Sequence, residues 1–255
     1  MTVLSGSAAA EVIPVRYPEG LAHGFLALRT LDGKTLADGD LIQSVRGDRV
    51  TSRLVLRFHD GSVHDETVVF SQRRSFRFLS DHLVQKGPAF GHPMEVSIDA
   101  RSGTVTVSYT EDGKEKTISE RMEIPPDLAN GLMLALLKNL DPRAPLTTVS
   151  LVAATPKPRL VKLAIAPAAE DRFTVGGSQR KAMHFVVHME IGGLAGLVAP
   201  LLGKQPPDTH VWILEGDAPA FVGSEGPFAA GGPVWRLELA CPTWPRAATP
   251  TSPPP

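Results

Sequence analysis

The feature that most constrains the fold of this chain is a long succession of short segments in which apolar and polar residues alternate. Leu54, Leu56 and Phe58, for example, form an apolar face, and the opposite face carries Arg53, Arg57 and His59. A period of two is typical of β-strands that have one face on a core and the other toward water. The alternating segments are Arg53–His59, Ser62–Phe70, Ser75–Leu83, Glu95–Asp99, Thr104–Tyr109 and Lys181–Glu190.

Turn signals separate many of these segments. Gly47-Asp48, Asp60-Gly61, Ser102-Gly103 and Asp112-Gly113 are dipeptides that favour tight connections between antiparallel strands. Their recurrence at intervals of about ten residues is typical of a β-sandwich or barrel. We therefore expect one large antiparallel sheet with about ten or more strands.

One segment departs from the alternation. Between Pro126 and Leu140, apolar residues recur at the spacing of one helix face, and Asp127 is placed to cap its start. A second apolar segment, Ile191–Gly203, is rich in glycine and predicts a short helix or a mobile flap. Together these patterns predict an α+β fold, in which a strongly curved antiparallel sheet, or half-barrel, wraps one main amphipathic helix and one short helix. The apolar positions of the main helix are Leu128, Leu132, Met133, Leu136, Leu137 and Leu140.

Length and composition indicate one globular domain, which we expect over residues 11–240. The chain has 255 residues, of which 42% are hydrophobic and 21% are charged, and these values are typical of a protein with a real core. Residues 1–10 are expected to be flexible, and residues 247–255 to form a disordered, proline-rich tail. The net charge of −1 provides no general basic field for nucleic acid. No apolar run approaches the roughly 20 residues of a membrane-spanning helix.

The N-terminus leaves the compartment open. It lacks the positive and apolar regions of a signal peptide, although Ser7–Ala10 resembles the end of one. We expect the bacterial envelope or periplasm if a leader has been lost, and otherwise the cytoplasm. The lone Cys241 forms neither an internal disulfide nor a zinc motif. The oligomeric state is also left open.

Several short motifs resemble a known family. The order of strands, helix and strands is similar to the LolA/LolB-like half-barrel proteins of the bacterial envelope, and closer still to an uncharacterised bacterial family with that fold. The resemblance covers roughly residues 20–239 and implies a deep sheet that holds a lipid or another apolar molecule in its concavity, with no catalytic residues. The motifs that carry it are Phe70-Ser71-Gln72, Phe76-Arg77-Phe78-Leu79, Gln85–Phe90, Ile124–Gly131, Val211–Leu214 and Pro219–Val222.

The sharpest polar cluster in the sequence surrounds His184 and His188. On a helix these two imidazoles could share a metal ion, but on a strand they lie about 13 Å apart. The alternation of this segment favours a strand, so no metal site is assigned. A site would need His188 and Glu190 to meet a third ligand such as His59, His64 or His210.

A second polar cluster, His59–Glu66, contains His, Asp and Ser close together. These residue types could form a hydrolytic site or a cation site. We interpret the cluster instead as the polar tip of a β-hairpin, because it straddles the turn at Asp60-Gly61.

The preferred functional hypothesis is non-covalent binding or carriage of a hydrophobic ligand, such as a lipid or acyl chain, which requires no cofactor. The alternative is a hydrolase of hydrophobic esters or lactones whose His-based or metal-assisted site includes His184, His188 and Glu190, with His59 or His64. A third possibility is an assembly module that uses an exposed strand edge. The residues expected to line the ligand cavity are Leu132, Leu136, Leu194, Leu197, Val198 and Trp212.

Overall fold

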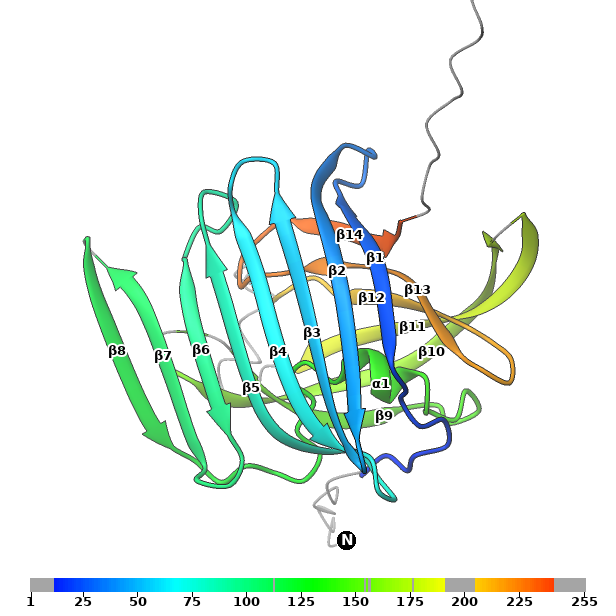
Figure 1. Ribbon diagram of the computed structural model, residues 1–255, viewed down its shortest axis with the longest axis horizontal. Helices are drawn as coiled ribbons and strands as arrows, with labels where there is room; N and C mark the ends of the chain where they lie inside the picture. The colour runs from blue at the N-terminus through cyan, green and yellow to red at the C-terminus, as the bar shows by residue number, and fades with distance from the viewer. Residues whose placement is uncertain are drawn as a thin grey trace, which may run out of the picture.

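A computed structural model describes residues 12–111, 113–153, 155, 157–175, 177–190 and 205–240. Fourteen strands form one antiparallel sheet in the order β8-β7-β6-β5-β4-β3-β2-β1-β14-β13-β12-β11-β10-β9 (Figure 1). The elements are β1 (Ala22–Arg29), β2 (Thr35–Arg46), β3 (Arg49–Phe58), β4 (Val63–Ser71), β5 (Arg77–Lys86), β6 (Met94–Asp99), β7 (Thr104–Glu111), β8 (Lys114–Arg121), α1 (Met133–Leu137), β9 (Thr147–Ala153), β10 (Arg159–Val175), β11 (Ser178–Glu190), β12 (Thr209–Leu214), β13 (Ala220–Pro227) and β14 (Val234–Leu239).

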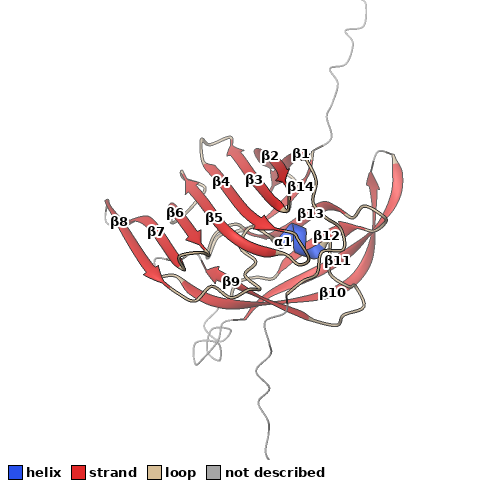
Figure 2. Cartoon of the chain, turned by 60° about the horizontal axis from the view of Figure 1, so that its bottom comes forward, coloured by secondary structure: helices blue, strands red, loops and turns tan. Residues whose placement is uncertain are grey.

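The sheet consists of two meanders that join where β1 pairs with β14. Strands β1–β8 form the first meander, and β9–β14 form the second. The second meander lies beneath the first, with α1 between them (Figure 2). Within the described ranges β8 and β9 each have one strand partner, so the curled sheet does not close into a barrel.

The inner faces of the two meanders form a common core. Alternate residues of each strand point inward, and the largest fully buried side chains come from both halves of the sheet. Leu28, Leu56 and Phe70 belong to the first meander, and Val149 and Ile165 belong to the second. The period of two in the sequence therefore identifies the inward positions correctly.

The predicted amphipathic helix over Pro126–Leu140 is wrong, and so is the α+β class that depended on it. Only Met133–Leu137 is α-helical, a length of five residues, and the fold is almost entirely antiparallel sheet. Gly131 breaks the helical pattern because its φ of +64° lies in the left-handed region. Residues 125–132 instead form an irregular segment that buries Leu128 and Leu132. The second predicted helix, in 191–203, lies outside the described residues.

This irregular segment also provides hydrogen-bond partners for the backbone groups at the free edge of β9. Leu128 forms an isolated parallel bridge with Ser150, and the Ala129 amide donates to the Ser150 carbonyl at 2.9 Å. The next residue continues this pairing: the Asn130 side chain accepts a hydrogen bond from the Val152 amide at 2.8 Å and donates one to the Val152 carbonyl at 3.0 Å. Asn130 thus replaces the backbone of a neighbouring strand, and the edge of β9 is protected from pairing with another chain.

Asp127 does not cap a helix as predicted. Its carboxylate accepts a hydrogen bond from the Ser150 hydroxyl at 2.8 Å and another from the Lys162 ammonium at 3.1 Å. Its side chain is fully buried, so these two charged and polar partners offset the loss of hydration. The interaction fastens the start of the irregular segment to β9 and β10.

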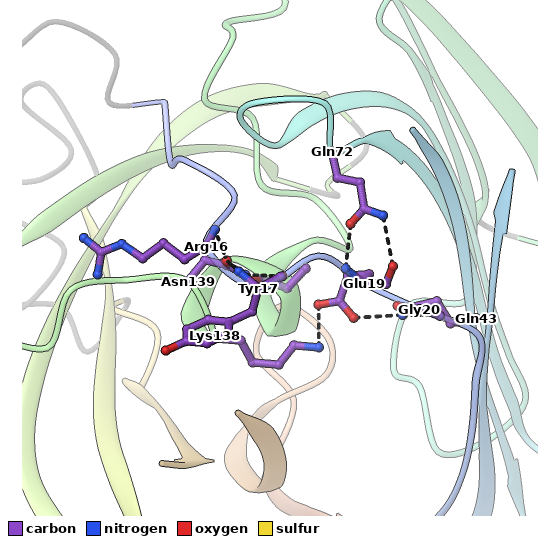
Figure 3. A network of polar contacts seen from close by, with 9 residues as sticks. Arg16, Tyr17, Glu19, Gly20, Gln43, Gln72, Lys138 and Asn139 are labelled. Carbon is purple, nitrogen blue, oxygen red and sulfur yellow. Dashed lines mark hydrogen bonds and ion pairs between the residues drawn. The ribbon is translucent and has the colours of Figure 1, made fainter. Parts of the chain in front are cut away.

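A second polar network fastens the end of the helix to the N-terminal segment (Figure 3). The Asn139 side chain accepts hydrogen bonds from the Arg16 and Tyr17 amides at 2.8 and 2.7 Å. Next to it, the Lys138 ammonium contacts the buried Glu19 carboxylate at 2.5 Å. Glu19 also accepts from the Gln43 side chain of β2 at 2.8 Å. Residues 127–139, which we call the plug, lie between the two meanders and are therefore held at both ends.

Within the described ranges, no helix has the length and apolar character that a membrane span requires.

Replacement of Gly131 by alanine tests the close approach of the irregular segment to the sheet. A Cβ atom at Gly131 would lie 2.7 Å from the Cβ of Val68 on β4, whereas a Cβ at Gly47 would meet nothing within 4 Å. Their φ angles, +64° and +63°, are nearly equal, so both variants bear the same backbone cost of about 1 kcal/mol. We expect Gly131→Ala to lower the free energy of unfolding by about 1–3 kcal/mol more than Gly47→Ala, because overpacking adds to that cost. Denaturant unfolding measures the difference, and equal losses would show that Val68 does not restrict this position.

Candidate functional site

A cavity of about 690 Å³ lies between the two meanders. One wall comes from β5 and β6, and the facing wall comes from β9, β10 and the end of β11. Most of the side chains around it are apolar, and the polar ones are few. Its lining residues are Leu83, Gln85, Met94, Leu151, Ala153, Thr155, Arg159, Val161, Met189, Gln205, Pro206, Pro207 and Pro227–Gly232.

The loop Phe228–Gly232 separates this cavity from a smaller one. The second cavity, of about 310 Å³, has the same loop as one wall and Trp235 and His92 among its other lining residues. The Gln85 amide donates to the Phe228 carbonyl at 2.6 Å, which holds the loop against β5. Gln85 is itself almost fully buried, with 2% of its surface exposed, so the large cavity is bounded by a fixed wall at this point.

Strand register places three ionisable residues on the inner face of the sheet, two of them beside the large cavity. His64 on β4 is opposite Gln85 on β5, Glu66 is opposite Leu83, and Val68 is opposite Asp81. Directly opposed residues of antiparallel strands share one face of the sheet. Since Gln85 and Leu83 line the cavity, His64 and Glu66 lie next to its wall.

His64 is buried in its neutral form. The Gln85 amide nitrogen donates to the Phe228 carbonyl, which can only accept, and the same nitrogen lies 3.1 Å from His64 Nδ1. Nδ1 therefore accepts, and the imidazole proton lies on Nε2, which has no hydrogen-bond partner among the described residues. Burial lowers the pKa of His64 to about 4, because the charged form loses its hydration.

Glu66 and Asp81 form a pair of neighbouring carboxyl groups on the adjacent strands β4 and β5. Glu66 is partly buried by area, but its carboxyl is surrounded by protein, and this desolvation raises its pKa to about 7. Asp81 is 4% exposed, and its Oδ1 has no partner among the described residues. Burial and the neighbouring Glu66 raise the pKa of Asp81 as well. The fold therefore favours the protonated, neutral forms of this pair.

The histidines predicted as catalytic candidates lie on different parts of the structure. His184 Nε2 is 2.8 Å from His210 Nδ1, on the face of the sheet opposite the buried Phe185 and Val187. His188 is exposed and contacts Asp208 at 2.7 Å, and Glu190 is exposed at the end of β11.

His59 and His64 lie on the other meander. His59 is exposed near Asp38, at 3.3 Å, whereas His64 points to the core. Among the described residues, no three His, Cys, Asp or Glu side chains are grouped so that they could hold a metal ion.

The residues predicted to line a ligand cavity have three different locations. Leu132 and Leu136 are buried in the common core, at 1% and 4% exposure, and do not line either cavity. Trp212 lies on the outer face, where its indole donates to Asp171 at 2.7 Å and its ring stacks on His184 at 4.7 Å. The remaining three, Leu194, Leu197 and Val198, lie outside the described residues.

The sequence reasoning missed the residues that line the large cavity. Met94, Leu151, Val161 and Met189 sit at alternating apolar positions, which identify the inner face, whereas Leu83 alternates with Asp81 and Gln85. That pattern does not distinguish inner positions that the plug covers from those that it leaves open. Glu66 was assigned to a polar hairpin tip, although the spacing Glu66, Val68, Phe70 places it on the apolar face.

Comparisons with known proteins yield one similar structure. The chain is similar to the crystal structure of a beta-barrel-like protein of domain of unknown function DUF1849 from Brucella abortus, with 11% sequence identity and a TM-score of 0.47. The similarity covers 91% of this chain and 98% of that chain. No protein-family model matches the chain, and no curated protein matches it. The resemblance to LolA/LolB-like proteins stays a prediction from its motifs.

The buried carboxyl pair predicts a loss of stability as the pH rises. Raised pKa values mean that the folded state keeps protons that the unfolded state releases, so stability is full below the ordinary carboxyl pKa of about 4 and falls as the pH rises through about 7. For His64 the sign is opposite, and stability is lost as the pH falls from about 6.5 to about 4. As the pH rises from about 6 to about 8, we expect the free energy of unfolding to fall less for Glu66→Gln than for the wild type.

Urea unfolding at the two pH values provides the measurement. The control is Glu115→Gln, which changes the charge equally at an exposed position on β8. If both variants show the wild-type dependence on pH, Glu66 is ionised in the folded protein throughout this range.

Proposed function

We propose that this protein binds a hydrophobic ligand without covalent chemistry, in the cavity of about 690 Å³ between the two meanders. The observation that carries the proposal is the composition of the cavity wall. Leu83 and Met94 contribute apolar surface from the first meander, and Leu151, Val161 and Met189 contribute it from the second. The volume lies within the usual range of small-molecule sites, about 300–1,000 Å³.

The energetics favour a ligand with a long apolar part. Burial of each methylene contributes about 0.8 kcal/mol, whereas association costs at least about 4 kcal/mol of translational and rotational freedom. A chain with several buried methylenes therefore gains enough to bind. Hydrogen bonds already fix two parts of the wall, Gln85 to Phe228 at 2.6 Å and Gln205 to Met189 at 2.7 Å, so little further ordering is needed.

Hydrolysis is less well supported. The nearest approach to a hydrolytic arrangement is the contact of Ser150 with Lys162 and Asp127, at 2.8 Å each. Ser150 is only 2% exposed, its hydroxyl donates to the carboxylate, and its backbone pairs with the irregular segment. These contacts secure the edge of β9, and no substrate carbonyl can reach the hydroxyl.

Filling the cavity should prevent binding without unfolding the protein. We expect Ala153→Phe to weaken the binding of an apolar fluorophore such as nile red to delipidated protein by about tenfold or more, because the ring displaces two or more buried methylene equivalents. Leu160→Phe is the matched control, since Leu160 is 44% exposed and lies on the opposite face of β10. Fluorescence titration gives both affinities, and thermal unfolding checks that the variants are folded. Equal binding by both variants, or no binding by the wild type, would contradict the proposal.

A further inference from the structure

The large cavity contains one charged residue among its described lining residues, Arg159. Arg159 is the first residue of β10 and lies opposite Ala153 in the register of β9 and β10. Its side chain shares the inner face with Val161 and Leu163, which are buried. Arg159 itself is exposed. The guanidinium group therefore lies at the rim of the cavity, where the apolar wall meets water.

The other polar lining side chains each make a hydrogen bond within the protein. The Gln85 amide donates to the Phe228 carbonyl, and the Gln205 amide donates to the Met189 carbonyl. The Thr155 hydroxyl donates to the Lys157 carbonyl at 2.7 Å. Arg159, in contrast, has no hydrogen bond or ion pair with any described residue. Arg159 thus supplies the one charged group of donors in the described wall.

We propose that the ligand of this cavity is an amphiphile with an alkyl or acyl chain and an anionic head group, a carboxylate or a phosphate, and that Arg159 binds the head group at the rim. This proposal rests on the proposed function and specifies its ligand class. The planar guanidinium presents N–H donors in a fork that matches two oxygens of either anion. The chain would extend along Val161 and Leu151 toward Leu83 and Met94.

The placement of the opposite charges agrees with this orientation. Glu66 lies beside Leu83 on the facing wall, away from the rim, and desolvation there favours the neutral acid. A neutral carboxyl does not repel an anionic ligand. A cationic amphiphile would instead face the guanidinium at the mouth of the cavity, which disfavours it.

The test compares four amphiphiles of one chain length as competitors of nile red: dodecanoate, dodecyl phosphate, dodecanol and dodecylamine. The proteins are the delipidated full-length wild type, Arg159→Gln, Arg159→Lys and Arg180→Gln. Arg180 is an exposed arginine of β11 outside the cavity lining, so its variant controls for the change in net charge. Each titration is repeated at low and high salt.

We expect at least one anion to bind the wild type more tightly than dodecanol does. Arg159→Gln should weaken the binding of that anion about fivefold, the upper range for a solvated ion pair, and leave dodecanol unchanged. Salt should weaken anion binding by the wild type and by Arg159→Lys but not by Arg159→Gln. The preferred anion distinguishes a carboxylate from a phosphate head group.

Four results would overturn the inference. Equal effects of Arg159→Gln and Arg180→Gln on the anions would show that only net charge matters. Tighter binding of dodecylamine than of either anion would assign head-group recognition to Glu66 and Asp81. Failure of all four competitors, dodecanol included, would overturn the proposed function together with the inference, whereas binding of dodecanol without any anion preference would overturn the inference alone.

Discussion

An open, curled sheet has to cover its concave face and to provide hydrogen-bond partners for the backbone at its free edges. The rest of this structure depends on how it meets these two requirements. The segment from Asp127 to Asn139 meets both requirements. Its apolar residues fill the space between the meanders, and its Asn130 side chain pairs with the edge of β9. At the opposite edge, five of the eight residues of β8 are lysine, glutamate or arginine, and the strand is largely exposed, which discourages pairing with another chain. One edge is thus protected by a contact within the molecule and the other by charge.

The plug covers only part of the concave face, and the uncovered part is where the candidate site lies. Leu56 and Leu54 on β3 each begin a row of directly opposed residues. These rows cross β4 and reach Gln85 and Leu83 on β5, respectively. Gln85 and Leu83 line the large cavity. A longer helix would present a regular surface along the whole length of these rows. The irregular segment instead approaches the sheet closely at Val68, where a Cβ atom at Gly131 would lie 2.7 Å from the Val68 Cβ. Among the described residues, the large cavity lies at the end of the concavity near β6 and β9.

The sequence predicts the sheet better than it predicts the plug, and the reason is physical. Strand alternation and turn dipeptides act locally, so β3, β4 and the turn at Asp60-Gly61 could be identified from a few residues each. The apolar spacing of Leu128, Leu132 and Leu136 fits a helix equally well, but Gly131 and the unpaired edge of β9 decide against it. The edge of β9 is a tertiary feature that no local pattern contains. The cavity depends on the same long-range packing, which is why its lining residues were missed while Leu132 and Leu136, its predicted members, belong to the core.

The proposed ligand site adjoins the two strands, β4 and β5, that hold Glu66 and Asp81. A neutral pair allows these two residues to stand among leucines and valines without counter-ions, and it keeps the wall apolar beside the cavity. An ionised pair would require water or a cation near Leu83, and either would compete with an alkyl chain for the same surface. The proton on the carboxyl pair thus stabilises the fold and preserves the apolar character of the site. In the proposed complex, the Arg159 guanidinium at the rim would bind the polar end of the ligand, so that its two ends meet opposite kinds of surface.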